Sequence, residues 1–274
     1  MKVTVLGSGS TGNAILITAE NTRVLIDAGL SAREIIRRMA LMGEDVEKLD
    51  GIIITHEHGD HAGGLRVLLN CVKCPVYMSE KTEFAYIREH RESGSKEPRR
   101  RAETLRGRLE KIESSREFKI GCLDFEPFAV PHDAVDNFGF RATRDGTSIA
   151  ALMDFGHITA LISEKLRGTA AILIESNHSR DMLKACEFYP WELKQRILSR
   201  VGHLSNEDVA EWLQNGFDGS AQYIVLTHLS QQANNPFVAE ISATSALRER
   251  APLFCDQYKV VLSHPREPTA WIEV

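Results

Sequence analysis

The 274-residue sequence lacks three features that would each point to a particular class of protein. No apolar run is long enough to span a bilayer, and the opening MKVTVLGSGS turns polar too early for a secretory signal. The five cysteines are odd in number and mostly scattered, so no disulfide framework is visible. These absences predict a cytoplasmic protein with reduced thiols and no membrane partner.

A global excess of positive charge is also missing. The formal net charge is −5, so any binding of a polyanion must come from a local basic patch. Hydrophobic residues make up 43% of the chain and charged residues 26%, which is typical of a globular protein with a large core. The composition does not distinguish a monomer from an oligomer.

Short β-type runs alternate with amphipathic helical stretches along the chain. Two groups of strands, each followed by helices, predict an α/β (α+β) protein in which two sheets pack face to face with helices outside. We expect residues 1–274 to form a single domain, with a charged insertion near 94–117. The predicted strands are 2–8, 14–19, 23–29, 49–56, 75–80, 117–130, 138–143, 148–156, 170–176, 223–230, 258–263 and 270–274. The predicted helices are 31–43, 62–72, 82–93, 190–202, 206–217 and 236–250.

Titratable side chains crowd directly after one buried strand, in the segment GIIITHEHGDHAGGL at 51–65. If the extended backbone persists, the alternation of His56 and His58 places both imidazoles on one side. Asp60 and His61 follow a glycine that permits a tight turn. Neutral imidazoles together with carboxylates suit zinc, manganese or iron better than calcium.

Three further candidates end predicted strands elsewhere in the chain, namely His132, Asp154 and His228. A single histidine at a strand end is more often a surface or capping residue than a metal ligand. Five histidines and two aspartates in this context favour a polynuclear metal site, because few folds tolerate so many polar groups after buried strands.

The segment THEHGDH resembles the T-H-x-H-x-D-H signature of the metallo-β-lactamase superfamily, and VLIDAG upstream has its counterpart there too. The resemblance extends over nearly the whole chain and implies an αβ/βα four-layer sandwich that holds two divalent metal ions. One metal would be held by His56, His58 and His132, and the other by Asp60, His61 and His228, with Asp154 bridging both.

Within that superfamily, GHLSNEDVAEW and LTHLSQQANNP resemble the paired motifs of phosphodiesterases of the tRNase Z-like and YycJ/WalJ-like branches. LIESNH occupies the place of their Glu motif. Together with GSGSTGNA, these segments resemble the YycJ/WalJ-like branch most. This implies a 5′-to-3′ exonuclease with a nucleic acid partner, DNA being favoured over RNA.

The chemistry expected of such a site is phosphodiester hydrolysis. Two cations about 3.5–4 Å apart would bridge a hydroxide that attacks phosphorus. Asp60 and Asp154 would orient this nucleophile, and His203, set by Glu175, would protonate or stabilise the leaving oxygen. The alternative for His203 is helix capping, although Ser205 already heads the following helix as its expected N-cap.

Four polar residues are candidates for substrate binding: Ser10, Asn13, Ser230 and Asn234. The first two lie in the turn GSGSTGN, which lacks both the Walker lysine and the dinucleotide fingerprint and could equally be a structural turn. Asn234 aligns with the fixed asparagine of the late motif in this branch.

Two questions stay open at this stage. The Arg-rich stretch (Arg99, Arg100, Arg101, Arg106 and Arg108) fits polyanion binding and a solvated helix equally well. The alternative enzyme is a small-molecule phosphodiesterase acting on cyclic nucleotides or ribosyl phosphates, whereas thiolester hydrolysis and a metal-stabilised binding protein without turnover fit the motifs less well.

Overall fold

A computed structural model describes residues 1–88, 96–251 and 257–274. The chain divides into two compact units. Unit 1 comprises Met1–Pro127, Ala134–Phe138 and Pro265–Glu273, and unit 2 comprises Phe128–Asp133, Gly139–His264 and Val274. The prediction of a single domain over 1–274 stays a prediction.

The sheet of unit 1 has seven strands in the order β14-β1-β2-β3-β4-β5-β6. The strands from β14 to β3 are antiparallel, and those from β3 to β6 are parallel. Their bounds are β1 Lys2–Gly7, β2 Ala14–Ala19, β3 Thr22–Ile26, β4 Gly51–Ile53, β5 Val76–Met78, β6 Leu109–Lys111 and β14 Ile272–Glu273. Unit 1 also contains β7 (Phe118–Ile120), which pairs antiparallel with the start of β8 (Leu123–Ala129).

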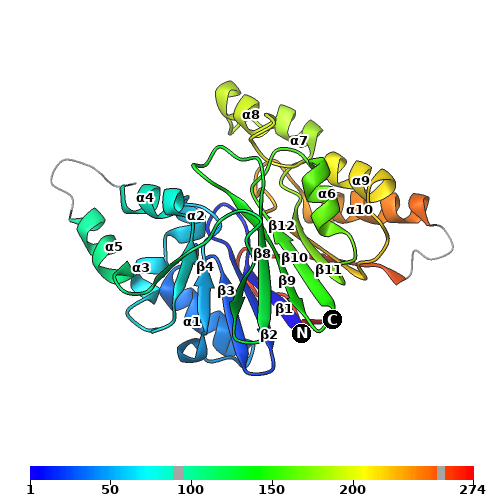
Figure 1. Ribbon diagram of the computed structural model, residues 1–274. Coiled ribbons are helices and arrows are strands. Elements are labelled where there is room, and N and C mark those ends of the chain that lie inside the picture. The colour runs from blue at the N-terminus through cyan, green and yellow to red at the C-terminus, as the bar shows by residue number, and fades with distance from the viewer. Residues whose placement is uncertain (89–95, 252–256) are drawn as a thin grey trace. The chain divides into compact units, whose positions relative to one another are not determined.

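The helices of unit 1 bury their apolar sides against this sheet. Ile35 and Met39 of α1 join Leu16 and Leu25 of the strands in one hydrophobic core. Figure 1 shows α1 beside the strands of unit 1. The helix bounds are α1 Ala32–Leu41, η1 Val46–Lys48 (a 3₁₀ turn), α2 Gly59–Ala62, α3 Leu65–Leu68, α4 Glu80–Arg88 and α5 Glu97–Leu105.

The segment expected as a charged insertion is built into unit 1, although residues 94 and 95 lie outside the described residues. Its helix α5 packs on α4 through Arg101, which is 5% exposed and lies 4.3 Å from the centre of the Tyr86 ring. Arg108 donates to the carbonyls of Leu69 and Val72, at 2.9 and 2.7 Å. These two arginines therefore stabilise the fold.

Five strands of the second sheet belong to unit 2, in the order β13-β12-β11-β10-β9. The strands from β10 to β13 are parallel, and β9 is antiparallel to β10. The strand bounds are β9 Phe138–Arg144, β10 Thr147–Leu152, β11 Ala171–Glu175, β12 Tyr223–Thr227 and β13 Lys259–Leu262. The helix bounds are α6 Ala160–Leu166, α7 Arg180–Ala185, α8 Trp191–Ile197, α9 Asn206–Asn215 and α10 Pro236–Arg250.

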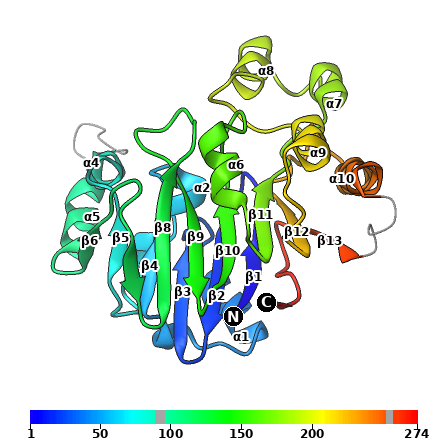
Figure 2. The ribbon, with the colours of Figure 1, turned by 45° about the vertical axis from the view of Figure 1, so that its right-hand side comes forward.

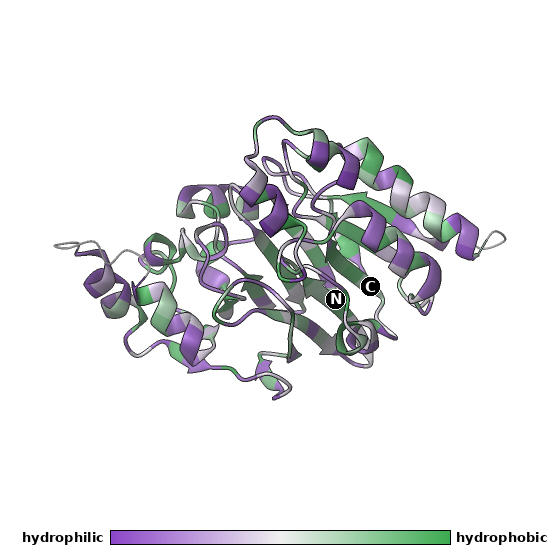
Figure 3. Cartoon of the chain, turned by 90° about the horizontal axis from the view of Figure 1, so that it is seen from above, coloured by the Kyte–Doolittle hydropathy of each residue, from purple (hydrophilic) through white to green (hydrophobic). Residues whose placement is uncertain are grey.

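Helices α6, α9 and α10 flank the strands of unit 2, which Figure 2 shows from a second side. Ile162, Trp212 and Leu247, one from each helix, share a hydrophobic core with β10–β12. In Figure 3 the strands are largely green and the helices carry both colours, as expected of half-buried amphipathic helices. Within the described residues, no helix is long and apolar enough to cross a membrane.

Candidate metal centre

The first half-site, defined as His56, His58, Asp60 and His61, follows β4 in unit 1. Strand β4 is fully buried, and the chain turns at its end into the short helix α2, for which His58 is the N-cap residue. The ring centroid of His56 lies 4.6 Å from that of His58 and 4.2 Å from that of His61. Three imidazoles therefore gather within one turn of chain.

Asp27, at the end of the neighbouring parallel strand β3, orients two of these rings. Its carboxylate accepts a hydrogen bond from Nδ1 of His61 at 2.7 Å and from the hydroxyl of Thr55 at 3.0 Å. That hydroxyl lies 3.0 Å from Nδ1 of His56, from which it can accept. Both rings then carry their proton on Nδ1 and present the lone pair of Nε2, as metal-ligating histidines do.

Burial opposes the charge of Asp27. The side chain is 0% exposed, and burial raises its pKa, while the neighbouring His61 and the hydrogen bonds from Thr55 act in the opposite direction. Hydrogen bonds from several donors offset the free-energy cost of burying a carboxylate such as this one. We did not predict Asp27 as a site residue, although it ends a buried strand just as Asp154 does.

The turn carrying Asp60 is held by close backbone packing within unit 1. The N–H of Asn13 donates to the carbonyl of Asp60 at 2.8 Å, and the N–H of Ala28 donates to that of His61 at 2.8 Å. A Cβ atom on Gly29 would lie 1.6 Å from the carbonyl oxygen of Asp60. Only glycine therefore permits this approach.

Asn13 is 0% exposed, and its side chain bonds to protein atoms. Its Oδ1 accepts from Ser8 at 2.8 Å, and its Nδ2 lies 3.0 Å from Nε2 of His61. This arrangement suits a residue that positions the first half-site, and the predicted substrate contact of Asn13 stays a prediction. Ser10 is exposed in the same turn.

The second half-site, in unit 2, is defined as His132, Asp154, Glu175, His203 and His228. Asp154 and His228 follow β10 and β12, and Glu175 is the last residue of β11 between them. Because parallel strands bring their carboxyl ends to one edge of a sheet, three residues distant in sequence meet there. Asp154 and His228 have φ angles of 55° and 53°, a strained conformation that clusters at functional sites.

Glu175 is the centre of this group. It is 0% exposed, and its Oε1 accepts from Nδ1 of His203 at 2.7 Å and from Nδ1 of His228 at 3.0 Å. Its Oε2 accepts from the backbone N–H of Phe155 at 2.9 Å. Burial alone raises the pKa of Glu175, but His203 and these hydrogen bonds outweigh burial and lower it. The predicted pairing of Glu175 with His203 is thus present in the structure.

The pKa values of His132 and His203 shift in opposite directions. Burial lowers the pKa of His132, whose Nδ1 lies 3.2 Å from the carbonyl of Gly202 and whose Nε2 lies 3.7 Å from Asp154. Burial also acts to lower the pKa of His203, but the charge of Glu175 and its hydrogen bond raise it above the ordinary value. A neutral His132 suits metal ligation, and a more basic His203 suits proton donation.

The ligand atoms of Asp154, Glu175, His203 and His228 all lie within 4.8 Å of one another, so this group alone could hold a cation. His178 nearby is 1% exposed, and burial lowers its pKa to about 4. By sequence alone His178 could approach the site, but His228 fits the last ligand position better.

The two late substrate candidates differ in their surroundings. Asn234 is 7% exposed, and its Nδ2 donates to the carbonyls of Ser176 and Asn177, at 2.8 and 2.9 Å. Ser230 is half-buried, and its hydroxyl lies 3.2 Å from that of Tyr189. Asn234 fastens the loop after β11, while the roles of both residues toward substrate stay predictions.

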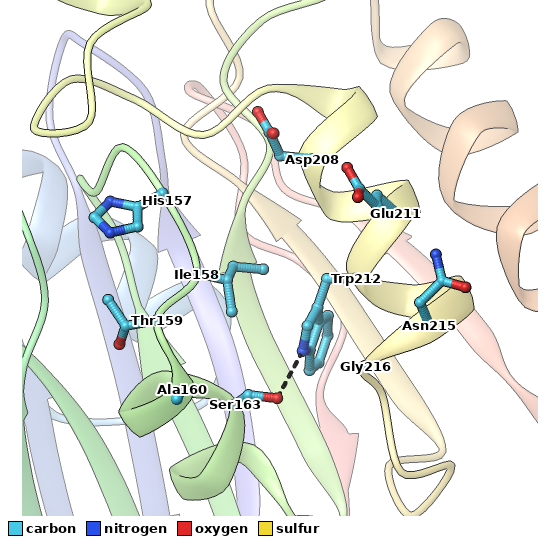
Figure 4. A pocket seen from close by; sticks show the side chains of 10 residues that line it. All are labelled: His157, Ile158, Thr159, Ala160, Ser163, Asp208, Glu211, Trp212, Asn215 and Gly216. Atoms are coloured by element: carbon cyan, nitrogen blue, oxygen red, sulfur yellow. Dashed lines mark hydrogen bonds between the residues drawn. The ribbon is translucent and has the colours of Figure 1, made fainter.

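Unit 2 also has a cavity of about 430 Å³ along α6 and α9 (Figure 4). Trp212 and Ser163 line it and are joined by a hydrogen bond of 3.3 Å from Nε1 to Oγ, and His157 and Glu211 also face it. None of the predicted site residues lines this cavity.

Comparison with known proteins identifies the family. The family model described as beta-lactamase superfamily domain matches residues 22–229. The chain is 33% identical to "Exodeoxyribonuclease WalJ" of Streptococcus pneumoniae, covering 100% of this chain and 98% of the relative. It is also 33% identical to "Exodeoxyribonuclease YycJ" of Bacillus anthracis, covering 97% and 96%.

A solved structure, the metallo-beta-lactamase fold protein YhfI from Bacillus subtilis, is similar with a TM-score of 0.69 and 14% identity, covering 98% of both chains. This likeness shows the fold and confirms the predicted α/β class of the metallo-β-lactamase type. The chain belongs to the β-lactamase superfamily, and within it to the family of the WalJ and YycJ relatives.

Proposed function

We propose that this protein is a metal-dependent phosphodiesterase that degrades DNA from the 5′ end. The observation that carries the proposal is the 33% identity, over nearly the full length of the chain, to two relatives named exodeoxyribonucleases. The clustered histidines and carboxylates of the two half-sites support it. The small-molecule alternative has no such support. The cytoplasmic location expected from the sequence is part of the proposal.

The donor chemistry of each half-site fits divalent metal ions. In the first, Asp27 and Thr55 set His56 and His61 as Nε2 donors, and in the second, His132 and His228 accompany the buried carboxylate of Asp154. We assign one cation to His56, His58 and His132, and the other to Asp60, His61 and His228, with Asp154 shared. Zinc, manganese and iron all suit these ligands.

The cations would supply Lewis acidity and lower the pKa of bound water toward neutrality. The side chains supply the rest of the chemistry. Asp60 accepts a hydrogen bond from the attacking water and orients it toward phosphorus. His203, held at Nδ1 by Glu175, offers its Nε2 proton to the 3′ or 5′ oxygen that leaves. The charge of Glu175 and its hydrogen bond raise the pKa of His203, which favours the protonated imidazole for this step.

The test uses purified protein with Mn²⁺ or Zn²⁺ and DNA labelled at either the 5′ or the 3′ end. We expect release of nucleotides in order from the 5′ end, and no activity in His58→Ala. The exposed His264 provides the matched control, because His264→Ala removes an imidazole outside both half-sites.

A parallel reaction with bis-p-nitrophenyl phosphate separates the alternatives. Hydrolysis of this ester without degradation of DNA would favour a small-molecule phosphodiesterase. Lack of turnover on both substrates by the metal-loaded protein would contradict phosphodiesterase function altogether.

A further inference from the structure

Helices α7 and α8 lie next to each other at the edge of unit 2, at the top of both Figure 1 and Figure 2. The segment they occupy exposes four large apolar side chains. Phe188 is 80% exposed and Trp191 is 65% exposed, and Leu198 and Val201 are exposed by 43% and 44%. Several large exposed apolar side chains within residues 188–201 indicate an interaction surface more strongly than a single exposed leucine does.

The local geometry explains why Trp191 and Phe188 are exposed. Leu193 and Ile197, four residues apart on α8, pack with Leu183 and Ala233 in a small core. Trp191 lies two residues before Leu193, about 200° around the helix, and so faces away from that core. Tyr189 turns into the core while its neighbour Phe188 does not.

The same segment is basic, in contrast to the chain as a whole. Residues 180–201 contain five lysines and arginines against three acidic residues, a net charge of +2 in a chain of net charge −5. Lys194 donates to the backbone carbonyl of Lys184 at 2.8 Å, and Arg200 lies 2.8 Å from Nε2 of His157. Their partners here are a carbonyl and an imidazole, so these contacts do not neutralise the two positive charges.

The surface is connected to the second half-site through short contacts. The hydroxyl of Tyr189, next to Phe188, lies 3.2 Å from that of Ser230, and the N–H of Ser230 donates to the carbonyl of Asn177 at 2.8 Å. The side chain of Asn177 donates in turn to the carbonyl of His228 at 2.9 Å. Tyr189, next to Phe188, is therefore linked through Ser230 and Asn177 to His228, which is a proposed metal ligand.

We propose that Phe188 and Trp191 form a stacking surface for the unpaired bases of a DNA strand, whose phosphates Lys194 and Arg200 contact. Exposed aromatic rings interleaved with basic side chains are the combination that binds single strands without sequence preference. An exonuclease that acts on a strand end must hold nucleotides that are no longer stacked in a duplex. The inference rests on the proposed function and specifies its substrate as single-stranded or frayed DNA.

The test compares Phe188→Ala, Trp191→Ala and the double variant with Trp191→Phe, which keeps an aromatic ring. Each metal-loaded protein is titrated by fluorescence anisotropy with a phosphorothioate oligothymidylate of about twelve nucleotides and with an abasic strand of the same length. Each alanine variant should raise the Kd for the oligothymidylate about 5- to 140-fold, from the usual contribution of one stacked base. Trp191→Phe should stay near the wild type, and no variant should change binding of the abasic strand.

The outcomes separate this inference from the proposed function. Wild-type-like binding by the alanine variants overturns it, as does an equal loss for both strands, which would indicate lost charge or lost fold. A change of oligomeric state in gel filtration with unchanged DNA binding would identify a protein interface instead. Turnover of bis-p-nitrophenyl phosphate should be unaffected in all variants. If the alanine variants lose binding of the oligothymidylate but the wild type never cleaves DNA, the proposed function is wrong and the stacking surface is still supported.

Discussion

Two buried carboxylates, Asp27 in unit 1 and Glu175 in unit 2, each organise a pair of side chains around them. Asp27 bonds to His61 directly and is linked to His56 through Thr55, while Glu175 bonds to both His203 and His228. The acids contact Nδ1 of His61, His203 and His228 directly, which orients these rings and leaves Nε2 for chemistry.

Asp27→Asn keeps the size of the side chain but removes the charge that holds the Nδ1 proton of His61. We expect the affinity for Mn²⁺ or Zn²⁺ to fall about 10- to 100-fold, as it does when partners of metal-ligating histidines are lost. Isothermal titration calorimetry measures this affinity. The control is Asp181→Asn, whose side chain is 95% exposed, and equal affinities in the two variants would contradict the role of Asp27.

His203→Ala tests the assignment of the proton donor. Its removal should lower the rate of DNA cleavage about 10²- to 10⁴-fold, the usual contribution of a general acid. Hydrolysis of bis-p-nitrophenyl phosphate should fall much less, because nitrophenolate leaves without being protonated. Equal losses on both substrates would instead assign His203 to metal binding, a role that its place among the four clustered ligand atoms of unit 2 also permits.

At the scale of elements, the carboxyl ends of strands carry the chemistry, and turns after them need close backbone packing. The clearest case is Gly29, where an added Cβ would meet the carbonyl of Asp60 at 1.6 Å. We expect Gly29→Ala to cost about 1–3 kcal/mol of stability, because backbone has to move. The displaced turn should also weaken metal binding. Thermal unfolding measures the stability and metal titration the affinity, with Ser10→Ala in the neighbouring exposed turn as the control. Wild-type stability and wild-type metal affinity in Gly29→Ala would contradict the need for glycine at this position.

Helix α1 provides a prediction on pH. Ser31 accepts from the N–H of Glu34, and the carboxylate of Glu34 pairs with Arg37 and Arg38. The hydrogen bond from Arg37, together with Arg38, lowers the pKa of Glu34 to about 2 from 4.5. Its stabilising effect is therefore present above pH 4.5 and is lost as the pH falls toward 2.

The matching experiment is urea unfolding of metal-free Glu34→Gln against the wild type at several pH values. The variant should be less stable near neutrality by up to about 1 kcal/mol, since the carboxylate is partly exposed. The difference should shrink as the pH falls through 4.5. Glu164→Gln, from the exposed pair with Arg167, is the control, and a difference that does not change with pH would rule out the ion pairs as its source.

Strand ends could be predicted from the sequence because a buried run followed by imidazoles or carboxylates is a local pattern. His56, Asp154 and His228 all follow that pattern. The partners of these residues were not predictable in the same way, since Asp27 lies 34 residues from His61 and the two meet only through pairing of β3 with β4. Helices α6 and α7, with seven and six residues, are too short for their periodicity to be recognised.

Burial was the other quantity that local patterns could not supply. The charge of Arg101 indicated a solvated or DNA-binding helix, yet this side chain is buried beside Tyr86. Asn13 and Asn234 are predicted substrate contacts, and the structure buries both among side-chain and backbone partners. Polar residues of this kind are assigned by the contacts that surround them, which depend on distant parts of the chain.

At the scale of the whole molecule, the proposed pair of cations takes ligands from both units. The first half-site supplies three histidines and an aspartate, and the second supplies His132, Asp154 and His228. Loss of a ligand from either unit should therefore reduce the number of cations that the chain retains.

The most direct test is the metal content per chain after loading and dialysis, measured by elemental analysis for the wild type, His58→Ala and His228→Ala. We expect about two ions for the wild type and a loss in each variant, with DNA degradation abolished in both. Retention of the full wild-type metal content by His58→Ala and His228→Ala alike, or a wild type that binds no divalent metal, would contradict the account.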